Sequence, residues 1–408
     1  MTLHAPTRRE LLLASGTLFT WAFVPRVARA EGRDPRLLVF VLRGALDGLA
    51  AVAPIGDPEW QRLRGEKALT LGRTPAALPL DSFFALNPAM PNFHRLYKSG
   101  AATVVHAVAT PYRERSHFDG QDVLESGFTG PGASESGWLN RALGALAPAA
   151  RVGGGKDAFA IGPIAPLVVR GSAPVLSWSP PRLPAASEDT LMRLLDLYRH
   201  TDPALARALD ERVGLATIAR AGGMDAQQPR AAGAGQVRAY FAESAGTAAK
   251  FLTRPDGPRI GALAFDGWDT HADEGVMSGR LANLLGALDG AIAAIETEMK
   301  AAWRETVVAI ITEFGRTARI NGTDGTDHGT ATVALLVGGA LKGGRVVADW
   351  PGLRPANLHE GRDLKPTTDL RAVLKGVLKD HLCVDDAALA TKVFPDSGRV
   401  KPMAGLLA

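Results

Sequence analysis

The sequence has little cysteine, little net charge and no long hydrophobic run beyond its first thirty residues. Cys383 is the single cysteine among 408 residues, which excludes an intrachain disulfide and leaves stability to a large hydrophobic core. The formal net charge is +4 and no run of Lys or Arg occurs, which argues against a nucleic-acid-binding surface. No later stretch approaches the roughly 20 apolar residues of a membrane-spanning helix, so we expect no transmembrane segment after the N-terminal region.

The first thirty residues have the pattern of a twin-arginine export signal. Arg8-Arg9 precedes the apolar stretch Leu11–Val24, which is too short to span a bilayer, and Ala28-Arg29-Ala30 matches a signal cleavage site. An amphipathic N-terminal helix is the alternative. Residues 1–30 carry a net +3, and subtracting this from +4 leaves +1 for residues 31–408. We therefore expect a near-neutral, soluble protein that is periplasmic or secreted.

The apolar runs of residues 31–408 predict an α/β fold with a mostly parallel sheet. The clearest unit is a strand at Ile260–Phe265, a helix with apolar residues at helical spacing over Leu281–Met299, and a strand at Thr306–Thr312. Such a strand–helix–strand unit is the crossover from which parallel sheets are built. Further strands are expected at Leu37–Leu42, Ala102–Val108, Ala158–Ile161, Pro166–Val169, Pro174–Ser177 and Thr332–Val337, and further helices at Ala89–Ser99 and Thr368–His381.

Residues 187–250 interrupt this alternation. Their apolar positions predict helices at Leu191–Tyr198, Ala204–Ala221 and Gln236–Leu252, with a flexible loop at Gly222–Gly235. We expect a helical insertion that packs on the sheet domain and could cap a site.

Acidic and histidine side chains lie next to the predicted strands, at the edge where open α/β sheets bind ligands. The candidate metal ligands are Asp47, Asp269, His271, Glu313, Asp327 and His328. Carboxylates and imidazoles gathered at one edge suit a divalent ion such as zinc, manganese or iron. The sequence therefore predicts a metal site.

Several of these candidates also have a structural interpretation. Asp47 could cap the next helix, and Asp269–His271 could be an exposed turn ahead of the long helix. Glu313 and Arg316 could hold a metal and an anionic ligand, or could pair with each other as a salt bridge.

A hydroxyl group lies ahead of the helix that is expected to run to about Gly127. Ser116 could cap that helix, or could act as a nucleophile, because a helix N-terminus stabilises negative charge. Arg113 and Arg115 could bind an anionic substrate or could simply be solvated. The local sequence does not separate these interpretations.

Together these motifs resemble the domain of unknown function 1501 family, which in turn resembles the alkaline phosphatase superfamily. The resemblance rests on the export signal and on Arg43–Leu49, Arg115–Gly127, Gly267–His271, Glu313–Thr317 and Thr326–Gly329, which occur in this order. It implies a mostly parallel sheet sandwiched by helices, a two-metal centre and a serine, threonine or modified-cysteine nucleophile.

The resemblance assigns roles to single residues. Asp47 corresponds to a ligand of one metal, and Asp269 with His271 to ligands of the second. Glu313 stands where an Asp-His pair normally ends a strand, and His328 resembles a late histidine, with Asp327 as a possible addition. The implied catalytic residues are Ser116, His117 and Arg316. A sulfatase with a modified cysteine is disfavoured, because Cys383 lies far from the position of the nucleophile.

The leading hypothesis is an exported metal-dependent hydrolase of phosphate or sulfate esters. It would hold one or two zinc, manganese or iron ions and act on an anionic small-molecule or polymeric ester, with Ser116 attacking the central atom. One alternative is an exported binding or assembly protein without turnover, with another exported protein as its partner. Another is a protein whose single ion only stabilises the fold.

Overall fold

The computed structural model describes residues 33–132, 134–146, 158–161, 165–178, 233–255 and 257–408, together with single residues between 198 and 209. The predicted signal at residues 1–30 lies outside these ranges. Residues 1–34 form a unit separate from residues 35–408, and the fold described below is that of the second unit.

The second unit is built on one large sheet of nine strands. Eight of them follow the order β11 (Arg345–Val347), β5 (Ala102–Ala109), β10 (Thr332–Val337), β9 (Thr306–Thr312), β1 (Arg36–Arg43), β8 (Ile260–Asp266), β6 (Ala158–Ile161) and β7 (Val175–Trp178), and β12 (Thr368–Asp369) also pairs with β5. Every pairing is parallel except those of β10, which is antiparallel to β5 and β9. A small second sheet contains β2 (Val52–Ala53), β4 (Ala85–Leu86) and β3 (Leu78–Pro79).

The central strand β1 shows why the sheet is buried on both faces. Successive side chains of a strand point to opposite faces, so a strand between two helical layers must be apolar throughout. Leu38, Phe40 and Leu42 belong to one hydrophobic cluster, and their neighbours Leu37, Val39 and Val41 belong to the other. The continuous apolar run therefore supplies two cores at once.

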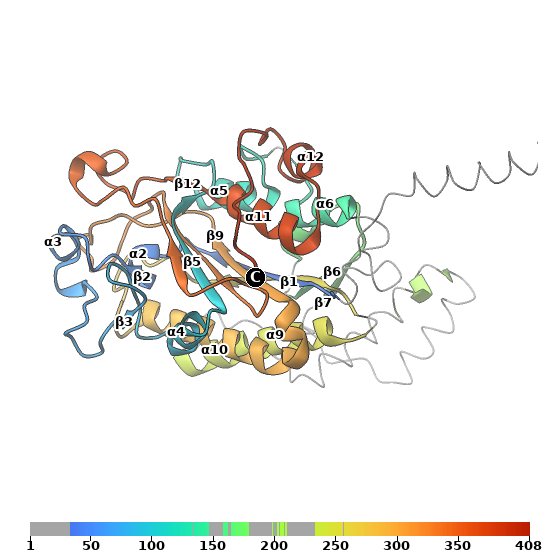
Figure 1. Cartoon of the computed structure of the whole chain (residues 1–408), viewed down its shortest axis with the longest axis horizontal. Helices are drawn as coiled ribbons and strands as arrows, with labels where there is room; N and C mark the ends of the chain where they lie inside the picture. The colour runs from blue at the N-terminus through green and yellow to red at the C-terminus, as the bar shows by residue number, and fades with distance from the viewer. Residues whose placement is uncertain are drawn as a thin grey trace, which may run out of the picture. The chain divides into compact units, whose positions relative to one another are not determined.

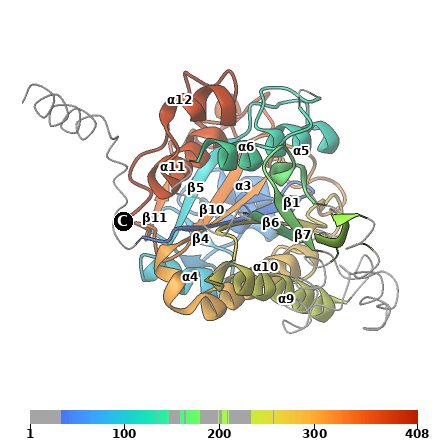
Figure 2. The same ribbon diagram turned by 90° about the vertical axis from the view of Figure 1, so that its right-hand side faces the viewer.

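Helices cover the two faces of the sheet, as the two views agree (Figures 1 and 2). One face carries α4 (Pro91–Lys98), α9 (Ala234–Thr253) and α10 (Arg280–Met299), and the other α5 (His117–Ser126), α6 (Trp138–Ala145), α11 (Leu370–Leu382) and α12 (Asp386–Ala388). Shorter elements are α2 (Gly48–Ala51), α3 (Trp60–Arg64), the 3₁₀ turns η1 (Gly65–Lys67), η3 (Leu167–Val169), η4 (Lys300–Glu305) and η5 (Pro355–Asn357), and the π-helical turn η6 (Leu389–Val393).

The predicted α/β fold with a mostly parallel sheet between helices is confirmed. The unit β8–α10–β9 is the expected crossover, and β1 lies between its two strands. The strand expected at Pro166–Val169 is wrong, because this segment forms the turn η3 and the Val168 amide donates to the Glu125 carboxylate instead of to a neighbouring strand. The helix expected from Thr368 begins at Leu370, after Thr368 and Asp369 have paired with β5.

The longest described part of the predicted insertion is α9, which matches the helix expected at Gln236–Leu252. It packs beside α10 on one face of the sheet, with Phe241 and Phe251 in the core of that layer. The helix predicted at Leu191–Tyr198, most of that at Ala204–Ala221 and most of the loop at Gly222–Gly235 lie outside the described residues. Among the helices that are described, none is both long and apolar enough to cross a membrane.

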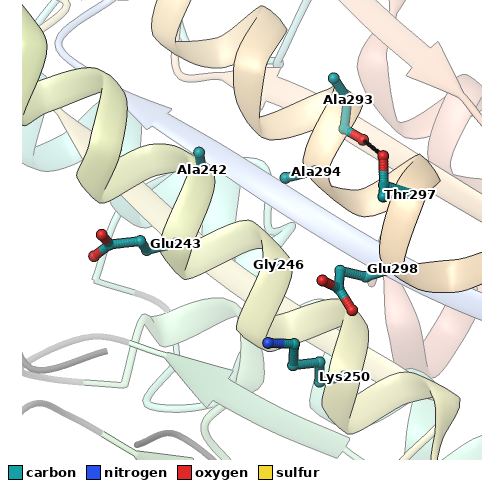
Figure 3. Close-up of a pocket in the computed structure, with 8 residues that line it drawn as sticks. All are labelled: Ala242, Glu243, Gly246, Lys250, Ala293, Ala294, Thr297 and Glu298. Carbon is teal, nitrogen blue, oxygen red and sulfur yellow. Dashed lines mark hydrogen bonds between the residues drawn. The ribbon is translucent and has the colours of Figure 1, made fainter. Parts of the chain in front are cut away.

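A shallow groove lies between α9 and α10 (Figure 3). Its lining includes small side chains and a few charged ones, namely Ala242, Gly246, Ala294, Glu243, Lys250 and Glu298. The Thr297 hydroxyl on its rim donates to the Ala293 carbonyl oxygen within α10. No candidate residue of the predicted metal site lines this groove, so the site lies elsewhere.

Candidate metal centre

The candidate ligands meet at the carboxyl ends of the parallel strands. Asp269 and His271 follow β8, and His117 opens α5, the helix that comes after β5. His328 precedes β10, and because this strand is antiparallel, its beginning lies at the same edge. Three segments that are distant in sequence therefore contribute to one site.

Three imidazole nitrogens surround one carboxylate oxygen. The Oδ1 atom of Asp269 lies 3.1 Å from His271 Nε2, 3.4 Å from His328 Nε2 and 3.6 Å from His117 Nε2. The Nε2 atoms of His271 and His328 are 2.9 Å apart. Ligands about 2.0–2.1 Å from a tetrahedral zinc ion are separated by roughly 3.3 Å. The ligand atoms of His117, Asp269 and His328 all lie within 4.8 Å of one another, a spacing compatible with a metal ion, and His271 Nε2 lies beside those of Asp269 and His328.

The other nitrogen of each ring faces an oxygen atom. His328 Nδ1 lies 2.9 Å from the Arg115 carbonyl oxygen, His117 Nδ1 lies 2.9 Å from Glu313 Oε1, and His271 Nδ1 lies 3.5 Å from Asp327 Oδ1. A carbonyl oxygen only accepts, so His328 carries a proton on Nδ1, and the neutral ring then presents a lone pair at Nε2. Oxygen acceptors that fix Nδ1 in this way are typical of metal-binding histidines.

This arrangement concentrates electron pairs at one point. His117 Nε2 is buried and, among the described residues, has no hydrogen-bond partner. His271 and His328 bring two ring nitrogens together beside a carboxylate. A cation at this point would use all of these lone pairs, so the residues present fit a metal ion.

The site is also accessible to solvent. The side chains of Asp269 and His271 are 40% and 46% exposed, and those of His117 and His328 are 23% and 25% exposed. Catalytic metal sites keep a coordination position open for water or substrate, whereas structural sites are closed by protein ligands. The exposure of this cluster is consistent with an open position.

Glu313 is buried beneath the cluster and orients His117. Its Oε1 accepts hydrogen bonds from the Gly44 amide at 2.8 Å and from Gln121 Nε2 at 3.3 Å, and Oε2 accepts from the Thr312 hydroxyl at 2.8 Å. Burial opposes ionisation of Glu313, but the hydrogen bonds from His117, Gly44 and Thr312 outweigh it and lower its pKa. Gly44 has a φ of +116°, and a Cβ atom there would lie 2.5 Å from the Asp269 amide nitrogen, so only glycine fits.

Arg316 has a positioning role instead of contacting solvent or substrate. It is 1% exposed and donates to the carbonyl oxygens of Ala45, Gly44 and Thr326 at 2.9, 2.9 and 3.1 Å. Its Nη2 also donates to Asp269 Oδ1. The salt bridge between Glu313 and Arg316, the alternative to their metal and anion roles, does not form: Glu313 contacts His117, and Arg316 contacts Asp269.

The structure places Asp47 in a different environment. Its carboxylate caps α2 by accepting from the amides of Leu49 and Ala50, and it forms a buried ion pair with Arg64 at 2.5 and 3.1 Å. These contacts correspond to the helix-cap interpretation of Asp47. The cluster described above does not include it.

Ser116 and Asp327 flank the cluster in different ways. The Ser116 hydroxyl accepts from the Asp119 amide at 3.5 Å, which makes it the N-cap of α5, directly before His117. Asp327 is 57% exposed and faces His271 Nδ1, so it would orient this ring and not bind the ion itself.

The resemblance assigns His117 to the catalytic residues. In the structure its Nε2 faces Asp269 Oδ1, as the Nε2 atoms of His271 and His328 also do. The sequence feature that points to a ligand role for His117 is its position after a predicted strand. The Arg115 carbonyl and Gln121 were missed, because a backbone acceptor and an amide inside a helix have no sequence signature.

The charges around His117 change its protonation. The neighbouring carboxylates of Asp269 and then Glu313 raise the pKa of His117 to about 9. Burial acts against ionisation of Asp269, but the neighbouring His117, His328 and Arg316 hold its pKa well below the usual range. In the absence of metal a proton on His117 would therefore place a positive charge beside Asp269.

We predict that Asp47→Ala destabilises the protein by about 3–5 kcal/mol without changing its metal content, because Arg64 is left buried and unpaired. Urea denaturation and elemental analysis measure the two effects. The control is Asp47→Ala combined with Arg64→Met, which should recover part of the stability. A loss below about 1 kcal/mol, as for exposed pairs, or loss of a bound ion would contradict this assignment.

We also predict that the metal-free protein loses stability as the pH rises. The folded state holds the His117 proton up to about pH 9, whereas the unfolded chain releases it near pH 6.5. The stabilisation is therefore complete below about pH 6.5 and disappears as the pH passes about 9. Metal affinity should rise over the same window, because the proton must leave.

Urea denaturation between pH 6.5 and 9 tests the stability part of this prediction. His117→Gln should flatten the pH dependence relative to the wild-type protein. An unchanged slope in this variant would show that His117 is not the titrating group.

Several solved structures contain chains that are similar to this one. Solved structures with similar chains include Ps i-CgsB in complex with k-i-k-neocarrahexaose, with a TM-score of 0.42, 10% identity and coverage of 91% of this chain and 77% of that chain. A protein in the alkaline phosphatase superfamily from Vibrio parahaemolyticus has a TM-score of 0.37, 14% identity and coverage of 91% and 71%. A phosphonate monoester hydrolase of Agrobacterium radiobacter has a TM-score of 0.35, 12% identity and coverage of 91% and 78%.

The comparison with curated proteins gives no match. The model of the family described as "Protein of unknown function (DUF1501)" matches residues 97–393, which run from the end of α4 to η6 and include every member of the metal cluster. This chain therefore belongs to the DUF1501 family.

Proposed function

We propose that the protein is an exported metal-dependent hydrolase of phosphate or sulfate esters, with one divalent ion at its centre. The ion would be held by His117, Asp269, His271 and His328. The observation that carries the proposal is the convergence of three Nε2 atoms on Asp269 Oδ1, each ring with its Nδ1 facing an oxygen.

The donor set decides the class of ion. Three imidazoles and one carboxylate suit zinc, manganese or iron better than calcium or magnesium, which prefer oxygen ligands. Such an ion, when bound, supplies a Lewis acid for an ester oxygen and an activated nucleophile near neutral pH.

A single ion is proposed because the groups expected to hold a second ion are engaged elsewhere. The Asp47 carboxylate is taken by Arg64 and two helix amides. Glu313 accepts from Gly44, Gln121, Thr312 and His117. Releasing either carboxylate would leave buried donors without partners, which is costly.

Ser116 is the proposed nucleophile. It begins α5 between two residues that support the centre, since the Arg115 carbonyl holds His328 and the His117 ring is itself a ligand. In the proposed step a bond forms between Ser116 Oγ and the phosphorus or sulfur atom while the bond to the leaving oxygen breaks, and the Oγ proton passes to the leaving oxygen. Water then attacks the phosphorus or sulfur atom, the bond to Oγ breaks, and phosphate or sulfate leaves as Ser116 regains its proton. The dipole of the α5 N-terminus favours the developing negative charge.

Two arginines at the edge of the centre are the proposed contacts for an anionic ester. Arg362 donates to the His328 carbonyl oxygen, and Arg115 lies directly before Ser116. Both guanidinium groups are also paired with the buried carboxylate of Asp363, and Arg115 with the exposed Glu360. These arginines are held in place at the edge of the site.

Export by the twin-arginine pathway is part of the proposal and rests on the sequence of residues 1–30. That pathway carries folded proteins, which suits a protein that binds its metal before it crosses the membrane.

We predict that the metal-loaded protein hydrolyses 4-nitrophenyl phosphate or 4-nitrophenyl sulfate, and that Ser116→Ala and Ser116→Asn both abolish turnover. Asparagine still caps a helix but cannot form the covalent bond, so the second variant separates the cap from the nucleophile. Metal content should be unchanged in both.

Release of 4-nitrophenol measures the outcome. Activity in Ser116→Asn but not in Ser116→Ala would reduce Ser116 to a helix cap. Metal binding with no turnover of either ester would favour a non-catalytic binding or assembly protein.

A further inference from the structure

The two loops that carry ligands are joined to each other by backbone hydrogen bonds. One loop follows β8 and contains Asp269 and His271, and the other precedes β10 and contains His328. The Thr326 amide donates to the Thr270 carbonyl oxygen at 3.1 Å, and the Glu274 amide donates to the Asp324 carbonyl oxygen at 3.1 Å. Any group that fixes this junction also fixes the distances within the cluster.

A buried carboxyl group lies at this junction. Glu274 is fully buried, and its Oε1 accepts hydrogen bonds from the hydroxyls of Thr270 at 2.9 Å and Thr326 at 3.3 Å. Both threonines are also fully buried. Thr270 stands between Asp269 and His271, and Thr326 stands two residues before His328. One oxygen atom therefore connects the two ligand-bearing loops.

We propose that Glu274 is a positioning residue of the metal centre: through Thr270 and Thr326 it holds Asp269 and His271 at the correct distance from His328. The inference rests on the proposed metal centre and deepens it. Glu274 contacts neither ion nor substrate. Its effect passes through the two hydroxyls, so it should change metal affinity and ligand geometry more than the general stability of the fold.

The electrostatic surroundings of Glu274 determine which substitution preserves its role. Burial, and then repulsion from Asp47, raise the pKa of Glu274 to about 8, while Arg64 and Arg316 act in the opposite direction. Burial therefore favours the uncharged acid. Glutamine keeps the Oε1 acceptor for Thr270 and Thr326 without adding a charge, whereas alanine removes the acceptor.

The experiment compares full-length wild-type protein with Glu274→Gln, Glu274→Ala and Thr326→Val. The Kd for Zn²⁺ is measured by competition with a chelator at pH 7, and the visible spectrum of bound Co²⁺ reports the ligand geometry. We expect Glu274→Ala and Thr326→Val to weaken Zn²⁺ binding about tenfold, as the loss of groups that orient metal ligands typically does. Both variants should also change the Co²⁺ absorption bands. Glu274→Gln should bind Zn²⁺ with the wild-type Kd and show the wild-type Co²⁺ spectrum.

The control is Asp289→Ala, which also removes a buried carboxylate. Asp289 lies on α10 and accepts from the amides of Asn92 and Phe93 at the start of α4, at 3.0 and 2.8 Å. This variant should unfold at lower urea concentration but bind Zn²⁺ with unchanged Kd.

The possible results separate two failures. If the wild-type protein binds no metal, the proposed function fails and the inference fails with it. If the wild-type protein binds Zn²⁺ and Glu274→Ala binds it equally well, the inference alone is wrong. Equal weakening in Glu274→Gln and Glu274→Ala would also overturn it. If Glu274→Ala does not fold, the Kd of Thr326→Val for Zn²⁺ tests the inference instead, and an unchanged Kd would contradict it.

Discussion

Three imidazole nitrogens and a carboxylate oxygen lie close enough together to share either protons or a bound cation. His328 must donate its Nδ1 proton to the Arg115 carbonyl, so its Nε2 presents a lone pair towards His271 Nε2, 2.9 Å away. A proton on one imidazole or a bound cation removes the repulsion, and the two compete for the same position. Metal occupancy, pH and the stability of the folded chain are therefore connected through one cluster of atoms.

The rest of the fold holds this cluster in place. The apolar strands β1, β8 and β9 form a sheet buried on both faces, and their carboxyl ends supply rigid starting points for the loops. Beneath the loops, Arg316 fixes Asp269 and Glu313 fixes His117, both from fully buried positions. Such preorganisation lets the ligands bind an ion without rearrangement, because their rotamers are already restricted.

The sheet was predictable because its central strands are continuous apolar runs, and Asp269, His271 and His328 were predictable because they lie beside such runs. The environment of Asp47 was not, since its partner Arg64 lies seventeen positions later, in a short helix without apolar periodicity. The orientation of His117 depends on Glu313, which is 196 residues away. Contacts of this range are set by the packed fold, and no local pattern reports them. The turn at Leu167–Val169 was missed for the same reason, because Glu125 binds its amide.

The central claim is that one divalent ion is held by His117, Asp269, His271 and His328. The most direct test is elemental mass spectrometry of the purified protein after reconstitution with zinc, manganese or iron, beside His328→Ala and the control His94→Ala. His94 is on α4 and binds the Pro79 carbonyl oxygen, away from the cluster. The account predicts about one equivalent in the wild-type protein and in His94→Ala, and none in His328→Ala. No metal in the wild-type protein, or an unchanged content in His328→Ala, would contradict it.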